Sequence, residues 1–139
     1  MSIVLPSQPH CHRALDTLLH RCDGVVAAMF ALRDGRSYAE RFRSTLPVNK
    51  FAAMSSSLVA LSNSVLREIA SDALNYLLIE GDAHKLVLCK VAGSKSPLIL
   101  SIMAKHEINL GLVLGLAKMC AKEVMEAEPT ESARATQTV

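Results

Sequence analysis

Two segments of the chain are apolar on both faces, without the alternation of apolar and polar residues that marks a half-exposed strand. The first runs from Gly24 to Leu32 and the second from Leu98 to Ala104. A strand that is apolar on both sides is covered on both faces, so these segments are predicted to be the central strands of a sheet. Asp34-Gly35 follows the first segment and predicts a hairpin into the polar, alternating strand Ser37 to Arg41, because Gly takes the positive φ of a tight turn.

Three further segments have the apolar spacing of helices, and two have that of strands. The first helix starts at Ser7-Gln8-Pro9 and ends before Asp23-Gly24, and its apolar residues recur at helical spacing. The longest periodic segment, from about Pro47 to Asp72, contains no Gly, and no Pro after its first turn. Further along the chain, Asn109 is a suitable N-cap for a last helix. The remaining predicted elements are a long helix over about Pro47 to Asp72, strands over Leu74 to Glu80 and Lys85 to Val91, and a helix from Asn109 to about Glu126.

This order of elements, α-β-β-α-β-β-β-α, contains no repeated strand-helix unit of the kind that builds a parallel sheet. It predicts an α+β fold with a five-stranded, mainly antiparallel sheet between helices. With the two apolar strands side by side in the middle, Ser37 to Arg41 forms one edge and Leu74 to Glu80 the other, because strands joined by a hairpin pair with each other. We expect one domain over residues 9–126, preceded by an extension over residues 1–8. Residues 127–139 are rich in Pro, Thr, Ser, Ala and Gln and are predicted to be a disordered tail.

Two features predict a homodimer. The strand Leu74 to Glu80 has no Lys or Pro to keep a sheet edge from pairing with another chain. The long helix has two apolar stripes, and the larger one, Phe51, Met54, Leu58, Leu61, Val65 and Ile69, is expected to cover the sheet. The second stripe is then covered either by another part of the same chain or by a second copy. The predicted dimer contacts are Ala52, Val59, Leu66, Ala70, Leu74, Tyr76 and Leu78.

Composition narrows the classes of function. The net charge is only +2, and the Lys and Arg residues are scattered among acidic ones, which argues against a nucleic-acid-binding surface. Four widely spaced cysteines without a secretory signal are typical of reduced thiols in the cytoplasm. The apolar stretch Leu110 to Ala117 is far shorter than the roughly 20 residues of a membrane-spanning helix. We therefore expect a cytoplasmic protein without direct membrane insertion.

No arrangement of residues points to catalysis. His10-Cys11-His12 and His20-Arg21-Cys22 contain metal-binding residue types, but their spacing is poor and Cys22 lies on the apolar stripe of its helix. Gly93-Ser94-Lys95-Ser96 lacks the phosphate-loop pattern and precedes a strand. We expect no metal, no cofactor and no enzymatic activity.

The last helix has apolar residues on two sides. Leu110, Val113, Ala117, Cys120 and Val124 form one stripe, and Leu112, Leu116 and Met119 lie on nearly the opposite side. The second group packs against the first helix on the same face of the sheet, or it binds a partner. The pattern alone does not choose between these two interpretations.

The ordered set of local patterns resembles a known family. The patterns are Leu18-Leu19 ahead of Asp23-Gly24-Val25, the apolar strand that ends in Arg33-Asp34-Gly35, Ala52-Ala53 in the long helix, and Asn109-Leu110-Gly111-Leu112 at the last helix. From about Ala14 to Val124 the chain resembles the Roadblock/LC7 domain, and within it bacterial gliding-motility regulators of Ras-like small GTPases. The resemblance implies a profilin-like architecture and a homodimer that binds a small GTPase or tethers other proteins. It implies a regulator that need not supply a catalytic residue of its own.

Three arginines are candidates for contact with such a partner. They are Arg41 and Arg43, after the second strand, and Arg67, on the long helix. The competing interpretation is solvated surface charge. Two other functions remain open: a small-molecule sensor of the PAS or GAF kind, and a nucleotide-independent scaffold for a motor or membrane complex. The sensor is disfavoured because its pocket is usually lined by aromatic side chains and this chain has two Tyr, three Phe and no Trp.

Overall fold

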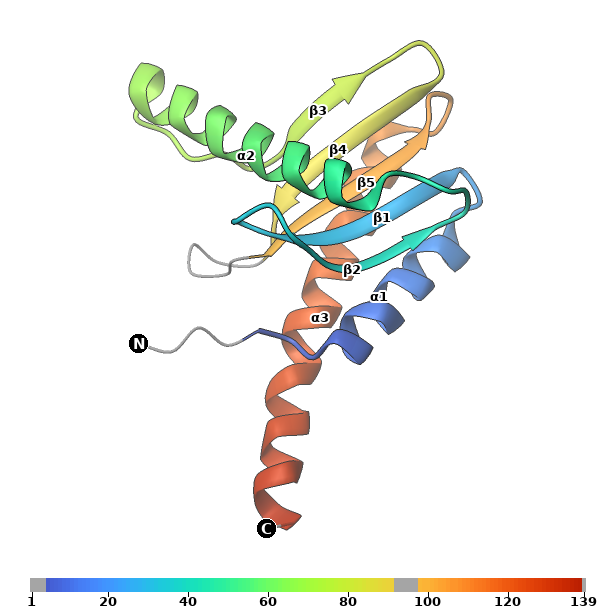
Figure 1. The fold of residues 1–139 in the computed structure, drawn as a ribbon, viewed down its shortest axis with the longest axis vertical. Coiled ribbons are helices and arrows are strands. Elements are labelled where there is room, and N and C mark those ends of the chain that lie inside the picture. Colours follow the sequence, from blue (N-terminus) through green and yellow to red (C-terminus); the bar gives the residue numbers. More distant parts are fainter. Residues whose placement is uncertain (1–4, 92–97, 139) are drawn as a thin grey trace.

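A computed structural model describes residues 5–91 and 98–138, with side chains described as far as residue 125. Its eight elements follow the predicted order along the chain (Figure 1). They are α1 (Gln8–Arg21), β1 (Val25–Leu32), β2 (Ser37–Phe42), α2 (Val48–Ala70), β3 (Leu77–Glu80), β4 (His84–Lys90), β5 (Leu98–Lys105) and α3 (Leu110–Thr138).

The five strands form one antiparallel sheet in the order β2-β1-β5-β4-β3. The two apolar strands β1 and β5 lie side by side inside the sheet, as predicted. The structure adds their register, with Met29 opposite Ser101. Gly35 has a φ of 93°, which is the left-handed conformation expected of the Asp34-Gly35 turn between β1 and β2. The α+β class, the antiparallel sheet and both edge strands are therefore confirmed.

Helices α1 and α3 pack on one face of the sheet and enclose the main core (Figure 1). The hydroxyl of Ser7 accepts a hydrogen bond from the backbone N–H of His10 and so caps the start of α1. Leu116 is buried in this core, whereas Leu112 and Met119 are exposed. Packing on the same sheet face as α1 therefore accounts for Leu116. The three apolar residues predicted on the second side of the last helix are thus divided, with Leu116 in the core and Leu112 and Met119 on the surface.

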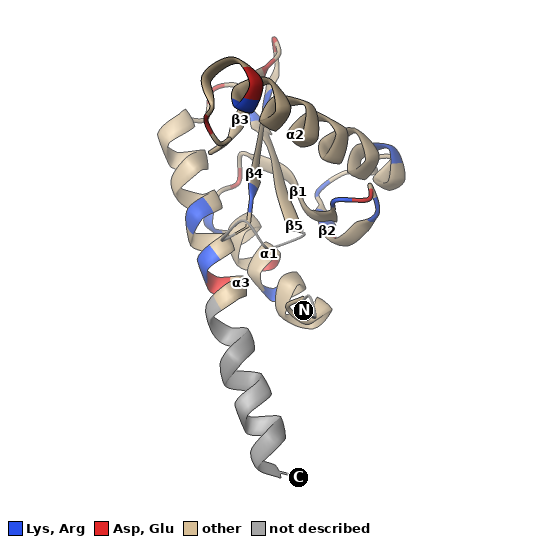
Figure 2. Ribbon diagram, turned by 90° about the vertical axis from the view of Figure 1, so that its left-hand side faces the viewer, with Lys and Arg blue, Asp and Glu red and all other residues tan. Residues whose placement is uncertain are grey.

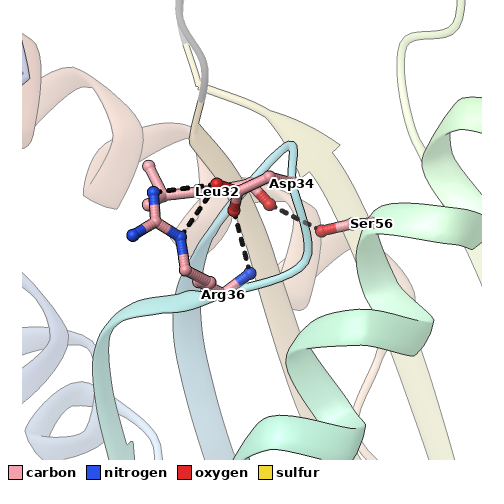
Figure 3. Close-up of polar contacts among 4 residues, drawn as sticks. All are labelled: Leu32, Asp34, Arg36 and Ser56. Carbon is pink, nitrogen blue, oxygen red and sulfur yellow. Dashed lines mark hydrogen bonds and ion pairs between the residues drawn. The ribbon is translucent and has the colours of Figure 1, made fainter.

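Helix α2 covers the other face mainly with the side that carries its second apolar stripe, while Phe51 and Leu58 of the predicted stripe are only half-buried. Ala52, Ser55, Ser56 and Val59 are buried against the sheet, whereas Met54, Leu61, Val65 and Ile69 of the larger apolar stripe are exposed. The small side chains let the helix backbone approach the strands closely, and the Ser56 hydroxyl donates a 2.7 Å hydrogen bond to the Leu32 carbonyl at the end of β1 (Figure 3). The prediction was wrong because it ranked the stripes by the size of their apolar residues.

The edge strand β3 is shorter than predicted. It spans Leu77–Glu80, so Leu74 and Tyr76 precede it rather than belong to it. Ser71 ends α2 in the left-handed conformation, and the backbone N–H of Leu74 donates to the side-chain oxygen of Asn63 at 3.3 Å. This bond holds the connecting segment against α2 and delays the start of the strand.

Helix α3 extends to Thr138, past the predicted end near Glu126. The side chains from residue 126 onward lie outside the described part of the chain, so the disordered tail stays a prediction. Within the described residues, no helix combines the length and the apolarity needed to cross a membrane.

Candidate interaction surface

The outer side of α2 carries an exposed apolar stripe. Its four members repeat at helical spacing along the helix: Met54 is 58% exposed, Leu61 65%, Val65 51% and Ile69 82%. Toward the start of the helix, the stripe borders an apolar hollow lined by Ala53, Met54, Ser57, Leu58 and Leu61. A row of large apolar side chains with no cover is typical of a protein-binding surface rather than of scattered surface residues.

The exposed stripe continues toward the open edge of the sheet. Leu58 packs in one cluster with Leu77 of β3 and Leu86 of β4, which places this flank of α2 over the β3 side of the sheet. Figure 1 shows α2 crossing over the sheet, with β3 toward the same end of the molecule, and Figure 2 shows both elements from the side. On β3 itself, Ile79 is 40% exposed, and Tyr76 just before the strand is 42% exposed.

In the described structure β3 pairs only with β4, so the outer edge of β3 is open. Its unpaired backbone N–H and C=O groups are a template for another strand. The exposed stripe of α2 together with this edge is here called the α2–β3 surface, defined by Met54, Leu61, Val65, Ile69 and Ile79. Tyr76 instead lines a hollow with Leu114 and Ala117 of α3.

The structure buries some of the predicted dimer contacts and leaves others at least partly exposed. Ala52 and Val59 are buried against their own sheet, so they are not available to a second chain in this conformation. Tyr76 and Ala70 are exposed, and the other three contacts are half-buried: Leu66, Leu74 and Leu78. A dimer contact at this helix and this edge strand stays a prediction, and Ala52 and Val59 belong to the side of the helix that meets the sheet.

The three candidate arginines also have different surroundings. The Nε of Arg41 lies 2.7 Å from the Asp16 carboxylate, an ion pair between β2 and α1. Arg43 donates to the carbonyl of Val25 at 2.6 Å and to the carbonyls of Leu19 and Cys22, where it satisfies backbone groups at the end of α1. Arg67 is exposed in the last turn of α2. Two of the three therefore have structural contacts within the chain.

The thiols lie in apolar surroundings. Burial raises the pKa of Cys89 to about 11, and burial followed by the nearby Glu123 carboxylate raises the pKa of Cys120 as well. Both are held as neutral thiols at neutral pH, which makes them poor nucleophiles and poor metal ligands. In the described part of the chain, no group of three His, Cys, Asp or Glu residues is placed to hold a metal ion.

Together these observations describe a small α+β domain that has an exposed apolar stripe and an open strand edge. The model of the Roadblock/LC7 domain family matches residues 13–95, more than half of the chain. The chain therefore belongs to the Roadblock/LC7 domain family, and this membership argues against the PAS- or GAF-like alternative.

Solved structures show the same fold. MglB of Myxococcus xanthus superposes with a TM-score of 0.79 at 14% identity, covering 94% of this chain and 96% of that one. The gliding protein MglB of Thermus thermophilus gives 0.76 at 16% identity, covering 93% and 97%. Profilin IA of Acanthamoeba castellanii gives 0.55 at 15% identity, covering 80% and 93%, in agreement with the profilin-like architecture. No curated protein matches the chain.

Proposed function

We propose that this protein is a homodimeric regulator or adaptor that binds a Ras-like small GTPase in the cytoplasm and modulates its GTP cycle without supplying a catalytic residue. The observation that carries the proposal is the α2–β3 surface, where large apolar side chains lie beside an open strand edge. Family membership and the fold shared with MglB support the class of partner.

The dimer that this surface supports is two-fold symmetric. In such an interface the same patch occurs on both subunits, so β3 pairs with β3 and the stripe of one α2 packs against the stripe of the other. The pairing satisfies the open backbone groups of β3 and removes Leu61 and Val65 from water. It joins the two sheets into one.

A regulator of this kind acts by holding its partner rather than by chemistry of its own. Arg41 and Arg43 already hold contacts within the chain, which disfavours them as groups inserted into another active site. Any change in the rate of GTP hydrolysis then comes from repositioning residues of the GTPase itself.

Substitution of Leu61 by Asp tests the dimer. The side chain is exposed in the single chain, so Leu61→Asp leaves the fold intact, but it places two carboxylates in the seam of the dimer. Light scattering at micromolar concentration is expected to give a dimer mass for the unchanged protein and a monomer mass for the variant. Leu112→Asp is the matched control, since Leu112 is also about half exposed but lies on α3. A monomer mass for the unchanged protein, or a dimer mass for Leu61→Asp, contradicts the proposed interface.

Capture from the native lysate tests the partner. With the unchanged dimer as bait, a small GTPase identified by mass spectrometry is expected to bind in a nucleotide-dependent manner, and its GTP turnover is then measured with and without the protein. Nucleotide-independent capture would replace the proposed role with the scaffold. An unchanged turnover rate would restrict the role to that of an adaptor.

A further inference from the structure

A second surface feature lies on the other flank of α2, away from the β3 edge. At 100° per residue, Ala60, Ser64 and Arg67 lie on the side of the helix opposite Leu58, which faces β3 and β4. There a cavity of about 230 Å³ opens between α2 and the ends of β1, β4 and β5. In Figure 1 this is the end of the sheet where β1 turns into β2.

The cavity concentrates positive charge. Arg33 from the end of β1, Arg67 from α2 and Lys90 from the end of β4 all line it, and none of its described lining residues is Asp or Glu. The whole chain has a net charge of only +2, and Arg33 has a further interaction of its own, so the local excess of positive charge rests mainly on Arg67 and Lys90. Cations gathered in a concave site raise the local concentration of anions.

The acidic residue nearest to Arg33 in the sequence is Asp34, and it is paired with Arg36. Asp34 follows Arg33 directly, but its carboxylate accepts two hydrogen bonds from Arg36, from the side-chain Nε at 2.8 Å and from the backbone N–H at 3.2 Å (Figure 3). Arg36 also forms an ion pair with Asp34 at 2.8 Å. Because Arg36 does not line the cavity, this pairing balances the charge of Asp34 within the turn.

Polar side chains of α2 complete the lining. The side-chain oxygen of Asn63 accepts the backbone N–H of Leu74, which leaves the two amide N–H groups of Asn63 as donors for a further acceptor. Ser64 adds a hydroxyl. Guanidinium, ammonium, amide and hydroxyl donors are the groups that bind phosphate oxygens through charge-assisted hydrogen bonds.

The size of the cavity limits the ligand. At about 230 Å³ it is smaller than the roughly 300–1,000 Å³ of pockets that bind drug-sized molecules, so it fits one compact anionic group rather than a whole nucleotide. A phosphomonoester is a dianion above about pH 6 and has three oxygens to share among several donors, whereas a carboxylate has one charge and two oxygens. We propose that the cavity lined by Arg33, Arg67 and Lys90 is a binding site for a phosphomonoester group.

A different role for Arg67 makes a distinct prediction. A cation in the last turn of a helix is stabilised by the helix dipole without any ligand. In that case Arg67→Gln lowers the stability of the protein slightly, and added phosphate does not change the difference. A binding site predicts instead that the effect of the substitution depends on phosphate.

The test uses inorganic phosphate and methyl phosphate as probes, in calorimetry and in thermal unfolding at pH 7.5. Both probes are expected to raise the unfolding temperature, because a ligand that binds only the folded state stabilises it. Arg67→Gln and Lys90→Gln are each expected to weaken binding about tenfold, the loss of one charge-assisted contact. Lys50→Gln removes the same charge from an exposed position of α2 outside the cavity and is expected to change the affinity by less than about twofold.

Two further measurements, a pH series and a comparison of vesicles, identify the ligand more closely. Binding is expected to weaken below about pH 6, where the phosphomonoester takes up its second proton. Vesicles that contain a phosphorylated inositol lipid are compared with vesicles of neutral lipid. Capture by the first alone identifies a lipid headgroup as the source of the phosphate, and binding of methyl phosphate without capture identifies a free small molecule.

The proposal is overturned if neither probe binds, or if Arg67→Gln and Lys50→Gln weaken binding equally. This inference does not rest on the proposed dimer. The cavity and the α2–β3 surface lie on different flanks of α2, so Arg67→Gln is expected to keep the mass of the unchanged protein in light scattering.

Discussion

The two faces of the sheet are covered in different ways. The face beneath α1 and α3 contains one continuous core, in which Phe30, Leu100 and Val113 have no exposed surface. The face beneath α2 contains two small clusters, one around Met29 and Ala52 and the other around Val59 and Leu88. Only on α2 do four large apolar side chains of a single described helix remain more than half exposed.

This difference shows how one domain can combine a stable core with an exposed apolar surface. Two helices share the burial on the first face, and apart from Leu112 and Met119 of α3 their large apolar residues are mostly turned inward. Helix α2 turns mainly small residues inward, and four of its large apolar residues remain exposed. Burial of apolar area supplies most of the free energy of folding and of association, so the first face holds the domain together and the second is suited to assembly.

The largest expected effect comes from the same truncation made on each face. Phe30→Ala removes a fully buried ring from the continuous core and is expected to lower the free energy of unfolding by about 3–5 kcal/mol in urea denaturation. Phe51 is half-buried on α2, where its ring lies 6.1 Å from that of Phe42. Phe51→Ala is expected to cost less than half as much, and an equal loss would remove the distinction between the two faces.

A smaller effect is expected from the contact that joins α1 to α3. The ring Nε2 of His10 is 2.9 Å from the backbone carbonyl of Glu123, to which it donates, and the side chain is buried. His10→Ala leaves this buried acceptor without the bond and is expected to lower the unfolding free energy by about 1–3 kcal/mol. His12→Ala changes a half-buried histidine of the same helix and serves as the control in the same denaturation experiment. Similar losses in both variants would show that the contact does not hold the two helices.

The pH dependence of stability tests the contribution of Cys89, which packs against the core beneath α1 and α3. Burial raises the pKa of Cys89 to about 11, above the value of about 8.5 for a free thiol. Between these two values the unfolded chain loses the thiol proton and the folded chain keeps it, so this contribution to stability is present below about pH 8.5 and declines as the pH rises toward 11. Urea midpoints measured from pH 8 to pH 11 are expected to fall less steeply in Cys89→Ala. An identical slope in the variant would show that this thiol does not contribute.

The smallest effect on the single chain is expected on the outer side of α2. Val65 is exposed, so Val65→Ala is expected to change the unfolding free energy of the monomer by less than about 0.5 kcal/mol. If the stripe forms the dimer, the melting temperature of the unchanged protein rises with its concentration, and the variant shows a weaker rise. Thermal melts over a dilution series measure both quantities. A large loss of stability at high dilution would indicate that Val65 belongs to the core of the single chain.

Local patterns predicted most of the fold because each depended on nearby residues. The apolar character of residues 24–32 and 98–104 on both strand faces identified the central strands, and Asp34-Gly35 identified the turn between β1 and β2. The start of β3 was misplaced, since the bond between Leu74 and Asn63 connects residues that are distant along the chain. No motif marked the phosphate site proposed here, because Arg33, Arg67 and Lys90 come from three separate elements.

The sequence by itself determined the order of the elements, the middle of the sheet and its two edges. Each of these follows from the period of apolar residues and from turn residues, which act over a few positions. Only the tertiary structure decided which side of α2 meets the sheet, because that choice depends on how closely Ala52, Ser55 and Ser56 let the helix approach the strands. It therefore also decided that Met54, Leu61, Val65 and Ile69 face outward, and that three distant cations line one cavity on the opposite flank.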